Sequence, residues 1–237
     1  MRRGLLLWTT FVVACSGSSA STSSSSSASA ATASKPEAPP EPAVDVPAAI
    51  AACKKGKEAA CKTGCDAQDL PSCLMQGQLA LASKDREEKA TCRVPLTKAC
   101  DGNLGRACSD LASRCSGILE LAGGKALPAS EELKLNQKAC ELGDGQGCLQ
   151  VAKRLEQGTG APKDPAKSAE LYKKALEILP KECDAGDARS CLLLASELDP
   201  EIKSKHPKDP KRAGELYKKA CDGGEAMGCA GMKRLVK

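Results

Sequence analysis

The sequence predicts an all-α protein: an α-solenoid of stacked helix–turn–helix repeats, each stapled by a disulfide. The first observation behind this prediction is a set of six cysteine pairs whose members stand eight residues apart. From the second pair onward, the first cysteines recur every 35 to 43 residues. A period of that length is typical of helical hairpins, which bury their apolar faces only against neighbouring hairpins. The second observation is that helix-start and helix-stop signals flank the cysteines.

The start signals are clearest in two segments that nearly repeat each other, 164–175 and 209–220. Both begin with Asp–Pro, in which the aspartate can cap the helix and the proline occupies the first helical position, where no N–H is needed. Apolar residues then recur with helical periodicity, and this periodicity places Tyr172 and Tyr217 on the core side. We therefore expect each segment to be the first helix of a hairpin.

The stop signals are glycines three residues after the first cysteine of a pair, where a left-handed residue can end a helix. They are Gly56, Gly143, Gly186 and Gly224.

One unit is longer than the others. The two Asp–Pro starts lie 45 residues apart, whereas the cysteines that follow them, Cys183 and Cys221, lie only 38 apart. Seven extra residues, 176–182, should therefore lengthen the helix before Cys183 by nearly two turns. Pro180 lies within this insert and is expected to kink the helix.

The cysteines are predicted to pair within each unit, because an antiparallel hairpin brings the end of one helix to the start of the next. Each such bridge closes about nine residues and contributes roughly 2.5 kcal/mol in the chain-entropy model. The expected pairs are Cys53–Cys61, Cys65–Cys73, Cys100–Cys108, Cys140–Cys148, Cys183–Cys191 and Cys221–Cys229. Among the first four cysteines the pairing stays open, because Cys61 and Cys65 are one turn apart and could exchange partners.

Cys92 and Cys115 remain, each about two turns from the same hairpin bend and each facing the partner helix. They predict a Cys92–Cys115 bridge. Pro95 disturbs the first of these helices, so Cys92–Cys100 with Cys108–Cys115 stays as the alternative.

The N-terminus has the features of an export signal: residues 1–14 combine Arg2 and Arg3 with an apolar stretch too short to span a bilayer. Val12 to Cys15 resembles the lipobox of bacterial lipoproteins, which implies cleavage before Cys15 and modification of that cysteine by diacylglycerol and palmitate. The alternative is an ordinary cleaved signal with an incidental Cys15. Ser16, which is not aspartate, favours the outer membrane over the inner one by the same resemblance.

Behind Cys15, residues 15–47 are rich in Ser, Ala and Pro and are predicted to be a disordered tether, because they cannot bury enough surface to order themselves. Residues 48–237 then form the repeat domain.

Composition argues against several functions. A formal charge of +5 in an exported chain is too slight to indicate nucleic-acid binding. Zinc sites need cysteines two to four residues apart with histidine nearby, whereas His206 is the only histidine. No serine is followed three residues later by lysine, so the Ser-x-x-Lys pair of penicillin-interacting enzymes is missing. The sequence thus predicts no metal, no cofactor and no catalytic residue, with His206 in a solvated polar loop.

Residues 97–237, and more loosely 50–96, resemble Sel1-like repeats, which are relatives of the tetratricopeptide repeat. The resemblance rests on Gly-Cys-Leu-Gln-Val-Ala at 147–152, the stretch 156–165, and Ala-Glu-Leu-Tyr-Lys-Lys-Ala at 169–175. A disulfide in every hairpin narrows it to the cysteine-rich Hcp type. The connection 116–128 departs from the pattern, since it lacks the usual turn and Asp–Pro start.

The resemblance implies a right-handed superhelix whose concave face binds a protein or peptide of the cell envelope. We therefore expect a membrane-anchored interaction scaffold rather than an enzyme. The alternative is β-lactam binding or slow β-lactam hydrolysis, which has been described for some Hcp-type proteins. A basic stretch could dock an anionic partner, although a solvated loop and helix start explain it better. It comprises Lys203, Lys205, Lys208, Lys211 and Arg212.

Overall fold

A computed structural model of the chain describes residues 45–121, 123–204 and 207–235, and every regular element in these residues is a helix. The first six are α1 (Val46–Cys53), α2 (Glu58–Asp66), α3 (Leu70–Ala82), α4 (Arg86–Ala90), α5 (Arg93–Asp101) and α6 (Gly105–Asp110). A π-helical turn, η1 (Leu111–Cys115), leads into α7 (Ser116–Leu121). The others are α8 (Ala129–Glu141), α9 (Gly145–Gln157), α10 (Pro165–Asp184), α11 (Ala188–Leu198), α12 (Pro210–Asp222) and α13 (Ala226–Leu235). This confirms the predicted fold class.

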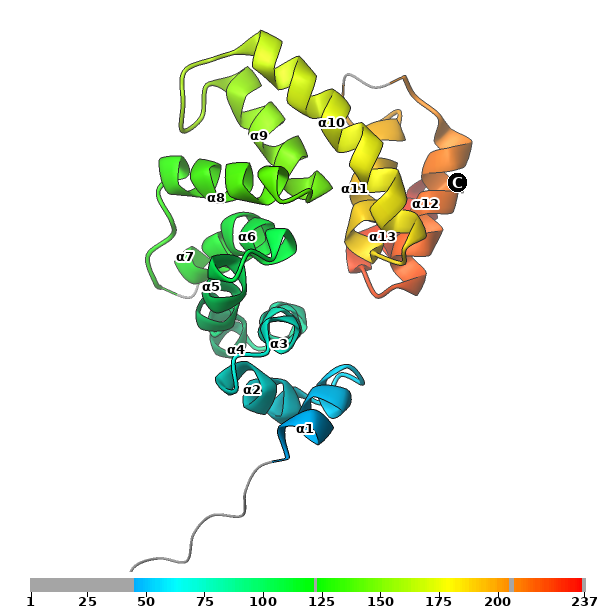
Figure 1. The fold of residues 1–237 in the computed structure, drawn as a ribbon. Helices are drawn as coiled ribbons and strands as arrows, with labels where there is room; N and C mark the ends of the chain where they lie inside the picture. Colours follow the sequence, from blue (N-terminus) through cyan, green and yellow to red (C-terminus); the bar gives the residue numbers. More distant parts are fainter. Residues whose placement is uncertain (1–44, 122, 205–206, 236–237) are drawn as a thin grey trace, which may run out of the picture. The chain divides into compact units, whose positions relative to one another are not determined.

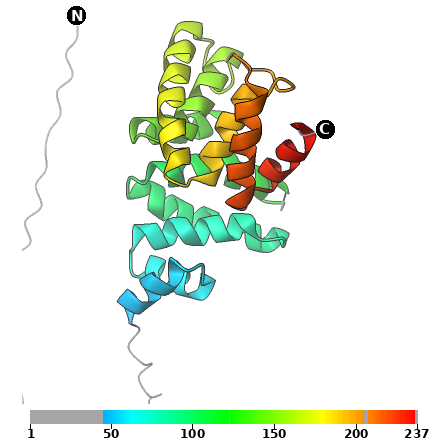
Figure 2. The same ribbon diagram turned by 90° about the vertical axis from the view of Figure 1, so that its right-hand side faces the viewer.

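The helices stack as hairpins in chain order within the compact unit 43–237 (Figures 1 and 2). The hairpins are α5–α6, α8–α9, α10–α11 and α12–α13. Before them, α2 packs against both α1 and α3. Successive hairpins pack through α3 on α5, α6 on α8, α9 on α10 and α11 on α12. None of the described helices is both long and apolar enough to cross a membrane.

The core of the stack is built from leucine, alanine and cysteine, with a single buried tyrosine. Tyr217 is 2% exposed, and its hydroxyl donates to Asp199 at 2.7 Å. Tyr172 lies on the core side as predicted, packed against a cluster that includes Ala175 and Leu179, but it is only partly buried and its hydroxyl donates to Glu197. A phenol can pack its ring while its oxygen keeps a polar partner, so periodicity alone does not fix how deeply a tyrosine is buried.

The Asp–Pro signals act as predicted. Asp164 accepts a hydrogen bond from the backbone N–H of Lys167 at 2.9 Å, and Asp209 accepts one from Arg212 at 3.0 Å. α10 has 20 residues against 13 in α12, so the insert does lengthen the helix, which runs on through Pro180.

The predicted glycine stops also hold: Gly56, Gly143, Gly186 and Gly224 have φ between +78° and +94°. In the two units without glycine, Gln68 and Asn103 take the same left-handed conformation, each at φ +66°. Asparagine tolerates this region, whereas glutamine has no such local compensation.

Replacing Gln68 with glycine is therefore expected to raise the free energy of unfolding by about 1 kcal/mol, since it removes the left-handed strain of a residue with a Cβ. Urea unfolding under oxidising conditions measures the change. The matched control is Gly143→Ala at the equivalent turn, which should destabilise the chain. Backbone strain would be the cause and a steric clash would not, because Gly143 has φ +86° and no other part of the chain lies within 4 Å of the new Cβ. An unchanged or lower stability of the Gln68→Gly variant would contradict the argument.

Candidate functional site

The structure brings fourteen cysteines together in seven disulfides. They are Cys53–Cys61, Cys65–Cys73, Cys92–Cys115, Cys100–Cys108, Cys140–Cys148, Cys183–Cys191 and Cys221–Cys229. Six of these bridges span eight residues and close the bend of a hairpin, whereas Cys92–Cys115 spans 23 and ties α4–α5 to η1. Most of these cysteines are buried, and only Cys221 and Cys229, in the last described hairpin, are half-buried. The helix ends around the bends are thereby held in place.

A groove of about 440 Å³ runs along these helix ends. It joins helices from distant parts of the sequence: α3, α4, α6, η1, the start of α11 and the turn between α12 and α13. Its lining is Gln78, Leu81, Ala82, Lys89, Arg106, Arg114, Asp187, Ala188, Arg189, Gly223, Gly224, Glu225 and Ala226. Cationic and small apolar side chains dominate this lining.

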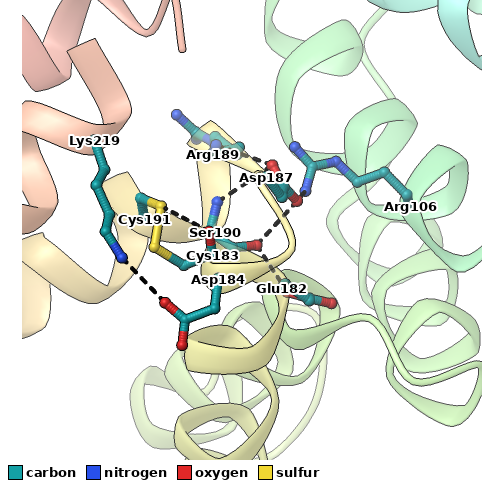
Figure 3. Close-up of a disulfide and its surroundings, with 9 residues drawn as sticks. All are labelled: Arg106, Glu182, Cys183, Asp184, Asp187, Arg189, Ser190, Cys191 and Lys219. Carbon is teal, nitrogen blue, oxygen red and sulfur yellow. Dashed lines mark hydrogen bonds and ion pairs between the residues drawn. A yellow bond between two sulfur atoms is a disulfide. The ribbon is translucent and has the colours of Figure 1, made fainter. Parts of the chain in front are cut away.

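Arg106 reaches across the groove from α6 to Asp187, the N-cap of α11, although the two residues are 81 apart in sequence. Figure 3 shows the hydrogen bond from the Arg106 guanidinium to the Asp187 carboxylate. The same carboxylate also accepts hydrogen bonds from the backbone N–H of Arg189 at 2.9 Å and from the Ser190 hydroxyl at 3.0 Å. The neighbouring Cys183–Cys191 disulfide holds this end of α11. The position of Asp187 is therefore fixed by its capping hydrogen bonds to the start of α11 and by the Cys183–Cys191 disulfide.

Beneath the groove lies Asp110, whose side chain is completely buried. Its Oδ2 accepts from Arg106 Nε at 3.2 Å and from Gln78 Nε2 at 3.0 Å. Its Oδ1 has no hydrogen bond in the described residues and lies 3.6 Å from Arg114 Nη1. Burial alone would lower the pKa of Arg106, but the charges of Asp110, Asp187 and Asp144 outweigh it and hold that pKa above its ordinary value. Arg106 is thus a fixed cation that joins the two sides of the groove.

Arg189 projects into the groove from the start of α11. Its Nε donates to Gln146 Oε1 at 3.3 Å, and its Nη1 lies 3.9 Å from a carboxylate oxygen of Glu225. Burial lowers the pKa of Arg189, and the neighbouring charges of Arg114 and Arg106 lower it further, against the opposing effect of Glu225 and Asp110. In the lining of the groove as a whole, four cationic side chains stand against two carboxylates, Asp187 and Glu225.

The groove residues are ones that our sequence prediction did not single out. A signal for them exists, because Arg106, Gln146 and Arg189 all stand two residues before the second cysteine of successive pairs. The structure places this repeat position at the N-terminal end of the second helix in each hairpin, where the three long polar side chains converge. The recurrence of a long polar residue at one repeat position beside the disulfide predicts that these side chains lie on the same face of successive repeats.

Other predicted residues lie elsewhere. Cys15, Lys205 and His206 are outside the described residues. Lys208 is exposed, but its ammonium group donates to the carbonyl oxygens of Glu197 and Ile202 at 3.2 and 2.6 Å, so it fastens its loop. Within the described ranges no three His, Cys, Asp or Glu side chains are placed to hold a metal ion.

A family model described as the Sel1 repeat matches residues 145–177 and 188–225. These two segments are therefore similar to Sel1 repeats. They cover the α9–α10 region and the α11–α12 region, including Arg189 and the turn that carries Glu225. Sel1 repeats typically mediate protein–protein interaction.

Curated relatives are similar over about half of the chain. Cytochrome c oxidase assembly factor 7A of Xenopus laevis is 31% identical over 114 residues, which are 47% of this chain and 48% of that protein. Cytochrome c oxidase assembly factor 7 of Xenopus tropicalis is 28% identical over 116 residues, with the same coverage. The chain spans about half the length of the curated relatives it matches.

Among solved structures, a Sel1 repeat protein from Oxalobacter formigenes has a TM-score of 0.43 and 21% identity, over 76% of this chain and 67% of that chain. The protective antigen c5321 from uropathogenic Escherichia coli strains, which displays an SLR fold, has a TM-score of 0.43 and 16% identity. That comparison covers 80% of this chain and 43% of that chain.

Proposed function

We propose that this protein is a non-catalytic scaffold that binds another protein of the bacterial cell envelope through the groove between α3, α6, η1 and α11. The observation that carries the proposal is that residues from Gln78 to Ala226 build one continuous surface, fixed by disulfides and by the Arg106–Asp187 bridge. A preformed surface binds with little loss of conformational entropy. The Sel1 repeats and the two relatives named as assembly factors support an interaction role.

The proposal includes a lipid anchor on Cys15, which holds the repeats at the membrane, with the outer membrane as the location. The N-terminal pattern supports this part of the proposal. Labelled palmitate should be incorporated by the unaltered protein and not by a Cys15→Ala variant expressed in the native bacterium. Equal labelling of both proteins would rule out the anchor without affecting the role of the groove.

Photo-cross-linking in intact cells tests the interaction. A photoreactive amino acid at position 82 or 226 replaces an exposed alanine that lines the groove, whereas position 170 on α10 serves as the control because Glu170 is exposed and outside the groove. We expect one envelope protein to be captured from positions 82 and 226 and not from position 170. Capture of the same proteins from all three positions, or of none, would contradict the proposed function.

A further inference from the structure

We propose that the groove binds an acidic peptide segment of its partner and that Arg114 and Arg189 together hold one of its carboxylates. This inference rests on the proposed function and adds the chemistry of the partner to it. It is carried by two partly buried guanidinium groups whose terminal nitrogens have no hydrogen-bond acceptor in the described part of the chain.

The distances show how incompletely the two arginines are paired. The Arg114 side chain is 24% exposed, and its Nη1 lies 3.6 Å from Asp110 Oδ1, beyond the range of a good hydrogen bond. The Arg189 side chain is 19% exposed; its Nη1 lies 3.9 Å from Glu225, and only its Nε donates a hydrogen bond, to Gln146. The terminal nitrogens of both groups therefore need acceptors from water or from a ligand, and a carboxylate supplies two.

The local charges favour an anion at the same place. The two facing carboxylates are already engaged, since Asp187 and Asp110 both pair with Arg106. Arg114, Arg189 and Lys89 line the groove together with one further carboxylate, Glu225, which lies beside Arg189. Burial is the largest cause of the lowered pKa of Arg189. Repulsion from Arg114 and Arg106 acts in the same direction, whereas the charges of Glu225 and Asp110 act to raise that pKa. A bound carboxylate would relieve this repulsion.

The rest of the lining fits an extended peptide better than a small organic acid. Leu81, Ala188 and Ala226 offer apolar contacts, and Gly224, whose Cβ position is open, lets another chain approach the backbone closely. The groove, at about 440 Å³, is open to solvent and has room for several side chains. Arg114 also lies in the π-helical turn η1, a rare conformation that recurs at functional sites.

The probe for the test is a fluorescein-labelled octapeptide of alternating alanine and glutamate, titrated with the full, oxidised chain and followed by fluorescence anisotropy. A peptide with glutamine in place of glutamate is its neutral counterpart. We expect saturable binding of the acidic peptide that weakens with added salt, and about tenfold weaker binding of the neutral peptide. Arg114→Gln and Arg189→Gln should each weaken binding of the acidic peptide by about tenfold. Arg93→Gln, at an exposed position outside the groove, should leave it unchanged.

Thermal unfolding of each variant establishes that it is folded. Arg114→Gln can destabilise the chain by weakening the pairing of Asp110, and in that case Arg189→Gln alone provides the test. No saturable binding of the acidic peptide, equal binding of both peptides, or unchanged binding by folded Arg189→Gln would overturn the inference. The cross-linking experiment separates the two proposals. A partner captured equally by unaltered and Arg189→Gln protein would leave the scaffold in place and overturn the carboxylate site alone, whereas a groove that captures no partner contradicts the scaffold itself.

Discussion

Replacing Arg106 with alanine should lower the free energy of unfolding by roughly 3 kcal/mol, because it leaves the buried carboxylate of Asp110 without its main counter-charge. The Asp110 side chain is 0% exposed, and Arg106 Nε is its closest cationic atom, at 3.2 Å, against 3.6 Å for Arg114 Nη1. The same substitution removes the contact with Asp187 across the groove. Urea unfolding of the oxidised protein measures the loss.

Two variants make this result interpretable. Arg93→Ala removes an exposed arginine from α5 and is expected to change stability by less than about 0.5 kcal/mol. Asp187→Asn weakens the contact across the groove but leaves Arg106 beside Asp110, so its cost should lie between those of the two other variants. If Arg106→Ala were no more destabilising than Arg93→Ala, Asp110 would not depend on Arg106 for its stabilisation.

Asp144 should make the protein less stable as the pH rises from about 4 to about 7. Burial raises the pKa of this N-cap carboxyl from 3.8 to about 6, and Glu182 adds to the rise, while the Gly147 N–H, Arg106 and Ser109 oppose it. Between these two values the folded state holds more protons than the unfolded state, so the free energy of unfolding falls with rising pH. The fall attributable to this group reaches about 3 kcal/mol when complete, since each unit of pKa shift corresponds to 1.36 kcal/mol.

The Asp144→Asn variant isolates this effect, because asparagine cannot ionise but keeps a side-chain oxygen. That oxygen can still accept the hydrogen bond that the Gly147 N–H donates to Asp144 Oδ1 at 2.6 Å. We expect the variant to be more stable than the unaltered protein at pH 7.5 and to lose that advantage near pH 4. Urea unfolding across this pH range measures the difference. Asp209→Asn makes the same substitution at an exposed N-cap and serves as control. A constant difference between Asp144→Asn and the unaltered protein at all pH values would refute the assignment.

The local features of the fold were predictable from sequence because their causes are local. Asp164–Pro165 and Asp209–Pro210 begin helices through contacts with residues three positions away. Gly143 ends a helix through its own left-handed backbone conformation, which depends on no distant residue. The spacing of eight residues between paired cysteines reflects one hairpin bend. By contrast, the π-helical turn at Leu111–Cys115 follows no residue pattern that we could identify in advance.

The groove could not be predicted in the same way, because its contacts depend on how hairpins stack. Arg106 and Asp187 lie two hairpins apart, and nothing in either local sequence indicates that they meet. Charge counts do not locate the groove either: the basic stretch around Lys208 belongs to a loop, as expected, while isolated arginines form the cationic surface. The recurrence of Arg106, Gln146 and Arg189 at one repeat position was visible in the sequence, but its meaning depended on knowing which face the position occupies.

The bridge from Arg106 to Asp187 also bears on how the protein unfolds. In a simple solenoid each hairpin contacts only its neighbours, so the terminal repeats can fray while the remainder stays folded. Here the ion pair joins α6 to α11 across the intervening α8–α9 hairpin. Opening any of these three hairpins breaks contacts made by the others, and they should therefore exchange their amide hydrogens as one cooperative block, while α1 and α13 at the ends of the described helices open independently.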